Sequence, residues 1–213
     1  MVINMAFAYL KEITDAAQKE QKPFWRIVIE DDMRERNVSY EQSFETMRQM
    51  YHAMKDADMA YDPDLRSASG MVGGDGKKLE EFRKKENRLI GDFLTEVMER
   101  AVKMGESNAC MKRIVAAPTA GSCGVIPAVL LTYEKQRNVT EDKLIEALFV
   151  AAGIGEVIAA SASIAGAEGG CQAEIGSASA MAAAGLAYLE GGDAECISHA
   201  MAFALKNLSL IHI

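Results

Sequence analysis

The chain has 213 residues, which is enough to bury a sizeable core and favours a single domain over residues 1–213. Its 23 basic and 31 acidic side chains give a formal net charge of −8, which argues against a nucleic-acid partner and against adhesion to an anionic membrane. No basic stretch precedes an apolar run at the N-terminus, and glutamates at positions 156, 168, 174 and 190 interrupt the later apolar runs. We therefore expect a soluble, cytoplasmic protein.

Helical patterns dominate the first third of the chain. We expect helices over 5–20 and 24–36, with a proline at the start of the second. Ser39 followed by Gln42 is typical of a capping box, and it predicts a third helix that ends near residue 59. The methionines on this helix repeat at helical spacing, so we expect them to belong to the core.

The stretch 61–76 holds a proline and four glycines and is the clearest predicted loop in the first half. Helical spacing resumes after it, and the predicted helix ends near 105–108. The residues that this spacing places on one face of the helix are Leu89, Phe93, Val97 and Ala101.

In the second half, a short apolar segment that begins at Val115 leads into a loop. A helix is expected to follow, with Pro127 in its first turn, where proline is tolerated. Thr140 is expected to cap the next helix, and Asp193 to cap the last one, over 194–207. No stretch shows the alternation of a β-strand. The chain is therefore predicted to be all-α, a compact helical domain with glycine-rich loops between its helices.

Three of these loops are rich in small residues: 67–76, 117–124 and 166–174. Uncovered backbone amides next to a helix start can bind a carboxylate or a phosphate, although for any one of these loops, taken by spacing alone, a helix cap or a close packing point is the commoner explanation. The third loop holds Cys171 between two runs of small residues, so we expect this thiol on a short loop between two buried helices, as a nucleophile or a metal ligand. The four cysteines, Cys110, Cys123, Cys171 and Cys196, form no CxxC motif, which favours free thiols or scattered ligands over disulfides.

The strings APTAGSCGVIPAVL, IAGAEGGCQAEIGSASAMAAAGL and SGMVGGDG together resemble the α chain of the two-subunit bacterial iron-sulfur L-serine dehydratases, in order and over nearly the whole chain. The resemblance implies an oxygen-sensitive enzyme that converts L-serine to pyruvate and ammonia with a [4Fe-4S] cluster and without pyridoxal phosphate. It also implies a β chain as partner and an oligomeric assembly.

The resemblance assigns site residues by position. Cys171 matches the first of three cysteines that hold the cluster and leave one iron open. The other two follow a Leu-Lys-Asn string that matches 205–207, but here the chain continues LSLIHI and lacks them. We therefore expect a C-terminally truncated piece of a longer chain, with two further cluster ligands absent. The residues expected to line the serine site are Ser69, Gly73 and Gly74 of one loop and Pro118, Thr119 and Gly121 of another.

Hydroxide is a poor leaving group, so an open iron would act as a Lewis acid on the serine hydroxyl while a base removes the α-proton. The sequence does not identify this base, and the β chain could supply it. Glu168 and Glu174 bracket the cysteine, either to orient it or bind the substrate ammonium, or simply to cap helix ends. Cys196 and His199 have the spacing of a metal pair, but two ligands alone favour ordinary packing.

Two other functions are also compatible with the sequence. One is a helical interaction module that needs its β chain and has no activity by itself. The other is a lyase for a different β-hydroxy amino acid such as threonine, because a small pocket separates one methyl group only weakly.

Overall fold

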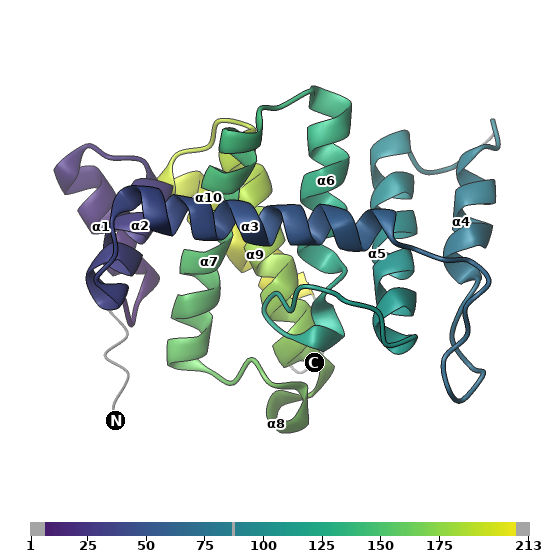
Figure 1. The fold of residues 1–213 in the computed structure, drawn as a ribbon. Helices are drawn as coiled ribbons and strands as arrows, with labels where there is room; N and C mark the ends of the chain where they lie inside the picture. Colours follow the sequence, from purple (N-terminus) through teal and green to yellow (C-terminus); the bar gives the residue numbers. More distant parts are fainter. Residues whose placement is uncertain (1–6, 87, 208–213) are drawn as a thin grey trace. The chain divides into compact units, whose positions relative to one another are not determined.

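A computed structural model describes residues 7–86 and 88–207 of the chain. These residues form helices and loops without a β-strand, which confirms the predicted all-α class (Figure 1). The chain divides into two compact units, one within Met1–Gln49 and Thr140–Ile213 and the other Met50–Val139, and the division falls inside α3 (Tyr40–Met59). The single domain expected over residues 1–213 stays a prediction.

The first unit is built around two apolar helices, α7 and α9. Its helices are α1 (Leu10–Glu20), α2 (Phe24–Arg36), the first half of α3, α7 (Glu141–Ser161), α9 (Ser177–Leu189) and α10 (Ala194–Asn207). α9 packs against both α7 and α10, and α7 also packs against α2. Gly153 permits this last contact, because a Cβ there would fall 2.5 Å from Cγ2 of Val28. Ile154, near the centre of α7, is completely buried.

α7 is long and apolar enough, by length and composition, to cross a membrane. However, 67% of its apolar window is buried inside the protein, as is usual for the central helix of a folded domain. The burial on this helix follows from its sequence, since after the first turn apolar and small residues occupy most positions and are interrupted only by Glu146 and Glu156.

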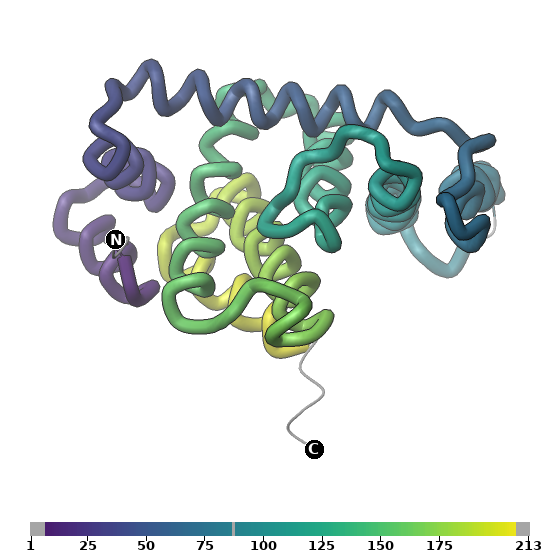
Figure 2. The backbone as a smooth tube through the Cα atoms, turned by 60° about the horizontal axis from the view of Figure 1, so that its bottom comes forward, coloured from purple at the N-terminus to yellow at the C-terminus, as the bar shows by residue number. Residues whose placement is uncertain are grey.

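The second unit is built around α5. Its elements are the second half of α3, α4 (Asp75–Arg83), α5 (Asp92–Ala109), the 3₁₀ turn η1 (Ala120–Ser122) and α6 (Val125–Arg137). α5 packs against α4, η1 and α6. Figure 2 shows the long segment that leads from the end of α5 to the start of α6. Gly124 lets α6 begin against α5, because a Cβ there would lie 2.6 Å from the carbonyl oxygen of Ala101.

Several predicted helix ends are confirmed. α2 spans Phe24–Arg36 as expected. Ahead of α3, the Gln42 amide donates to Oγ of Ser39 over 3.2 Å, and the Ser39 amide donates to Oε1 of Gln42 over 2.9 Å, which is the predicted capping box. Oδ1 of Asp193 accepts from the Cys196 amide over 2.9 Å and caps α10. Thr140 stands at the N-cap of α7, but its hydroxyl makes no capping bond.

Other boundaries differ from the predictions. The expected start of the first helix at residue 5 lies outside the described residues, and within them α1 begins at Leu10. The loop 61–76 ends earlier than expected, because Asp75 and Gly76 already belong to α4. This helix was missed because its sequence, DGKKLEEFR, carries too few apolar residues to show helical periodicity.

The buried face of α5 is not the face on which the sequence places its spaced apolar residues. Leu89 precedes the helix and is fully exposed, and Phe93, Val97 and Ala101 are only half-buried. The residues of α5 that are buried are Thr95, Glu96, Glu99, Met104, Glu106 and Ser107. Polar groups can occupy an interior face when each finds a partner, and the glutamates on this face do so.

Candidate functional site

The first glycine loop, residues 67–74, is closed by its own hydrogen bonds. The Ser67 amide donates to the carbonyl of Val72 over 2.9 Å, and the Val72 amide donates to Oγ of Ser67 over 3.2 Å. The hydroxyls of Ser67 and Ser69 lie 3.1 Å apart. Ser69, predicted to bind substrate, is exposed on this loop.

Gly73 and Gly74 close the loop and lead into α4, in conformations that favour glycine. Their φ angles are 136° and 83°. A Cβ at Gly73 would lie 2.4 Å from the carbonyl oxygen of Leu65, and one at Gly74 would lie 2.8 Å from the guanidinium of Arg66. Within the described part of the chain, the amides of these two glycines donate no hydrogen bond.

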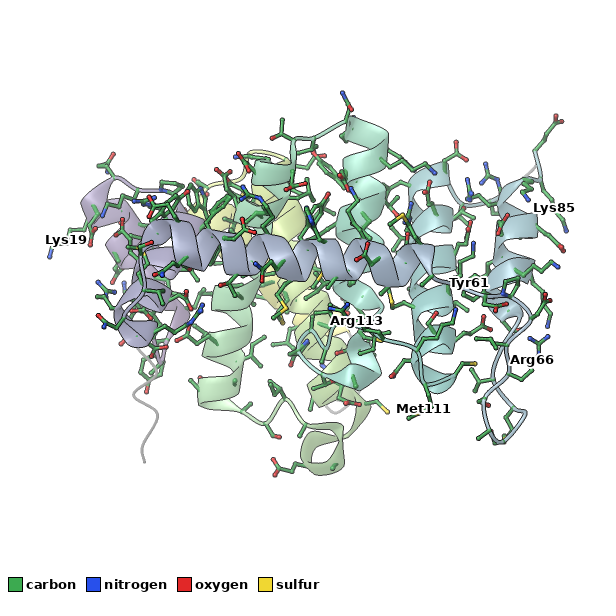
Figure 3. The ribbon with its side chains drawn as sticks, in the orientation of Figure 1. Lys19, Tyr61, Arg66, Lys85, Met111 and Arg113 are labelled. Atoms are coloured by element: carbon green, nitrogen blue, oxygen red, sulfur yellow. The ribbon has the colours of Figure 1, made fainter. Side chains whose placement is uncertain are left out.

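The backbone that follows Gly74 is held by Glu106 of α5. Oε1 of Glu106 accepts from the Asp75 amide over 2.6 Å, and Oε2 accepts from the Gly76 amide over 3.2 Å. Oε2 also accepts from the hydroxyl of Tyr61 over 2.7 Å. Figure 3 shows Tyr61 and Arg66 on the segment that leads into α4. The glutamate is 5% exposed, so a buried carboxylate fixes the end of the loop.

The second glycine loop, residues 117–124, contains η1 and is also attached to α5. Nδ2 of Asn108 donates to the carbonyl of Ala120 over 3.0 Å. The Thr119 hydroxyl lies 3.1 Å from Oγ of Ser122, which also accepts from the Thr119 amide over 3.4 Å. Ser122 is 1% exposed, so this pair forms the folded base of the loop.

The six predicted substrate residues therefore all lie on two loops of the second unit, and both loops are attached to the last turns of α5. Gly121 is exposed, and Pro118 and Thr119 are half-buried. The Thr119 hydroxyl, expected to face substrate, is engaged with Ser122 in this structure.

The segment expected to be a loop around Cys171 is helical instead. It forms α8 (Gly166–Cys171) followed by the π-helical turn η2 (Gln172–Gly176), which runs into α9. The only break is at Gly170, with φ 70° and ψ −172°. Glycine content suggested a loop, but the Ala, Glu and Gln residues of the segment favour helical turns, and η2 continues directly into α9.

The glutamates that bracket the cysteine have local partners. Oγ of Ser163 donates to Glu168 over 2.6 Å and accepts from the Ala165 amide over 3.1 Å, which supports the helix-end interpretation of Glu168. The Glu174 side chain covers Gly166, where a Cβ would lie 2.4 Å from its Oε2. Nε2 of Gln172 donates to the carbonyl of Leu205 over 3.0 Å and ties η2 to α10.

Cys171 belongs to the first unit, and its thiol is exposed and free. Among the described residues, the one group of three possible metal ligands is Asp31, Glu35 and Glu156, and Cys171 belongs to no such group. Cys196 and His199 are both exposed on α10 and so are not part of the core, and neither belongs to the group of possible metal ligands found among the described residues. His52 is also exposed, and His212 lies outside the described residues.

Sequence reasoning missed the glutamates of α5. Glu96 accepts from Lys135 over 2.7 Å and Glu99 accepts from Lys103 over 2.7 Å. Burial acts to raise the pKa of Glu96, but hydrogen bonds from Lys135 and Arg100 outweigh it and lower the pKa. The sequence does contain a pattern that could have located these glutamates, since the charged residues at 96, 99, 103 and 106 are spaced along one face of a helix. Such a pattern, however, usually indicates a solvent-exposed surface.

Comparison with known proteins gives a consistent result. The family described as "Serine dehydratase alpha chain" matches residues 19–209. The chain is 37% identical over 202 residues to a protein of Bacillus subtilis named "Probable L-serine dehydratase, alpha chain", covering 95% of this chain and 67% of the relative. It is 34% identical over 201 residues to the "L-serine dehydratase, alpha chain" of Peptoniphilus asaccharolyticus, covering 93% and 68%. The "L-serine dehydratase" of Helicobacter pylori is 36% identical over 198 residues, covering 86% and 41%.

Proposed function

The chain belongs to the serine dehydratase alpha chain family, and from this premise we propose that it is the α subunit of an L-serine ammonia-lyase, which converts L-serine to pyruvate and ammonia. The observation that carries the proposal is the family match over residues 19–209, which includes both glycine loops and Cys171. We further propose that the chain works in the cytoplasm, in an oligomer with a β chain, as the "alpha chain" in the names of its relatives suggests.

The first glycine loop supports binding of the substrate carboxylate. The amides of Gly73 and Gly74 donate no hydrogen bond within the described residues, and neither residue carries a side chain that would cover them. Backbone amides in such a turn form a concave anion site, and hydroxyls such as that of Ser69 add a donor. These groups, with Pro118, Thr119 and Gly121, are proposed to hold L-serine.

The family resemblance also implies an iron-sulfur cluster and no pyridoxal phosphate. The exposed thiol of Cys171 is suited to bind iron as a thiolate. The described residues nevertheless do not fit a complete cluster site, because no second cysteine, histidine or carboxylate joins Cys171 in a group of three ligands. Two further thiolates would have to come from elsewhere.

The described residues can bind and orient the substrate. Loss of the α-proton and of the β-hydroxyl as water converts L-serine to 2-aminoacrylate, which hydrolyses to pyruvate and ammonia. This elimination requires the α-hydrogen to face a base and the hydroxyl to face an acid, so a carboxylate fixed by the glycine loop would set the orientation of both. Gly74→Val or Thr119→Val should therefore lower serine turnover in the complete enzyme, and unchanged turnover would exclude these positions.

The decisive experiment is anaerobic reconstitution of the full chain with its β chain, iron and sulfide, followed by assays with L-serine and L-threonine. We expect pyruvate from serine at a higher kcat/KM than 2-oxobutyrate from threonine. A sample without iron serves as the control. An assembly that takes up iron but forms pyruvate from serine at no measurable rate would exclude the function, and it would favour the inactive interaction module.

A further inference from the structure

We propose that Glu106 is a positioning residue for the substrate loop, because its two carboxylate oxygens hold the first two amides of α4 and the Tyr61 hydroxyl directly after Gly74. The inference rests on the proposed function, since it assigns Glu106 to the binding of the L-serine carboxylate by Gly73 and Gly74. Glu106 acts through the backbone and is not proposed to touch the substrate.

The partners of Glu106 distinguish it from the other buried glutamates of α5. Glu96 and Glu99 pair with lysine and arginine side chains and join α5 to its neighbours. Glu106 forms no ion pair within the described residues, and it accepts three hydrogen bonds from two backbone amides and a phenol. A buried carboxylate in this arrangement serves to hold a segment of backbone.

The position of these amides explains why a residue from another helix is required. A helix leaves its first amides without partners, and the N-cap side chain usually accepts from one of them. The N-cap of α4 is Gly74, which has no side chain and lies at φ 83°. Glu106 replaces the missing cap, and its negative charge is favourable at a helix N-terminus.

This arrangement also determines which amides remain available. Glu106 occupies those of Asp75 and Gly76, whereas those of Gly73 and Gly74 donate to no described residue. The capped amides lie one and two residues after Gly74, so fixing them restricts the orientation of the two free ones. Without Glu106, the amides of Asp75 and Gly76 would also be free to bind an anion, in competition with those of Gly73 and Gly74. The backbone of the two glycines would then no longer be held in one orientation.

Tyr61 donates to the carboxylate, and α4 lies close against α5 at the same point. A Cβ at Gly76 would lie 2.5 Å from Cγ of Lys103 and 3.0 Å from the Tyr61 oxygen, so only glycine allows this close approach of α4 to α5. Burial and the hydrogen bond to Glu106 raise the pKa of Tyr61, so its hydroxyl remains a donor at neutral pH.

The test compares three variants of the full chain, reconstituted with its β chain, iron and sulfide. Glu106→Gln keeps the size of the side chain but places an NH₂ group against backbone donors. Tyr61→Phe removes one of the three bonds and leaves the amides capped. Glu99→Gln is the matched control, because Glu99 is equally buried on α5, at 5% exposure, but accepts from the Arg83 and Lys103 side chains and not from the backbone amides at the start of α4.

For Glu106→Gln we expect KM for L-serine to rise roughly 10- to 100-fold, with a smaller fall in kcat, as for the loss of a hydrogen bond to a charged group. Tyr61→Phe should raise KM roughly 2- to 5-fold by the loss of one neutral bond. Glu99→Gln should lower the melting temperature without changing KM. An unchanged or lower KM in Glu106→Gln, or an equal rise in Glu99→Gln, would overturn the inference.

Hydrogen exchange gives a readout that does not depend on turnover. In Glu106→Gln the amides of residues 73–76 should exchange faster than in the wild type, whereas in Glu99→Gln they should not. Unchanged exchange in Glu106→Gln overturns the positioning role, even if the enzyme turns over serine. An inactive wild type with iron bound would instead exclude the proposed function, so the two failures are distinguishable.

Discussion

At Gly73, a single added methyl group meets backbone that cannot move aside. The Cβ of alanine would lie 2.4 Å from the Leu65 carbonyl oxygen at a φ of 136°, which alanine rarely adopts. We predict that Gly73→Ala lowers stability by about 1–3 kcal/mol and lowers kcat/KM for serine at least about tenfold. Gly91→Ala is the control, since its Cβ meets nothing within 4 Å. Urea unfolding and steady-state assays measure both effects, and a wild-type kcat/KM in Gly73→Ala would contradict the prediction.

The second prediction concerns the pH dependence of stability at Glu156. Burial, together with the charges of Asp31 and Glu35, raises the pKa of Glu156 to about 7, although the Phe7 amide partly opposes this shift. Its Oε1 is buried without a hydrogen-bond partner among the described residues. Because the folded pKa is raised, the protonated form favours folding, and this contribution is lost as pH rises from the ordinary value of 4.5 through about 7.

Glu156→Gln should therefore melt about 2–4 °C above the wild type at pH 8 and show a weaker decline of stability between pH 5 and pH 7. Thermal unfolding monitored by circular dichroism at several pH values measures this. The exposed Glu86→Gln serves as the control, with no expected effect. A lower melting temperature for Glu156→Gln at pH 8 would show that the carboxylate is stabilised by a favourable partner.

A third prediction at this scale concerns the thiols. Cys171 and Cys196 are exposed, whereas Cys123 is 1% exposed and burial raises its pKa. Iodoacetamide should therefore alkylate the first two rapidly and Cys123 slowly in the metal-free chain, as mass spectrometry would show. After reconstitution with iron and sulfide, Cys171 should become protected while Cys196 stays reactive. Continued reactivity of Cys171 in iron-loaded protein would exclude it as a ligand.

At the scale of elements, α5 depends on two glycines in opposite ways. A Cβ at Gly124 would lie 2.6 Å from the Ala101 carbonyl oxygen and would separate α6 from α5, whereas a Cβ at Gly105 meets nothing within 4 Å. We expect Gly124→Ala to destabilise the protein by about 1–3 kcal/mol. Gly105→Ala should stabilise it by about 0.5–1 kcal/mol, since this glycine is exposed inside a helix. Denaturant unfolding tests the pair, and equal effects of the same sign would contradict the packing described.

The sequence predicted elements well where caps and apolar stripes agreed. Ser39 with Gln42 located the start of α3, and Asp193 that of α10, because each capping bond is local. The buried face of α5 could not be predicted in this way. Glu96 and Glu99 are buried because lysines and arginines from α4, α5 and α6 reach them, and Glu106 because backbone amides of α4 do, which is a property of tertiary packing.

The candidate site could be predicted only in part, because local sequence strings are recognisable whereas contacts between helices are not. The resemblance located the glycine loops and Cys171, since the recognisable strings contain them. Glu106 belongs to no such string, and its role depends on the fold of α4 against α5. The helical form of the cysteine segment was also missed, because its glycines favoured a loop while the segment forms α8 and a π turn that continues into α9.

At the scale of the whole molecule, burial is uneven between helices. α7 and α9 contain fully buried residues such as Ile154 and Ala184, whereas Gly76 is the buried residue of α4. Amides of α7 and α9 should therefore exchange with solvent only on global unfolding, and those in the last turn of α4 at least about tenfold faster. Hydrogen exchange with mass spectrometry measures this order, and equal protection of α4 would contradict it.

The π-helical turn at residues 172–176 has an evolutionary consequence. A π turn contains one residue more than the α turn it replaces, so loss of a single residue from η2 would restore a regular helix. The packing of α9 would be unchanged, while Cys171 would rotate by about 100° around the helix axis. Insertions and deletions in this turn could thus redirect the thiol during divergence of the family while the core remained the same.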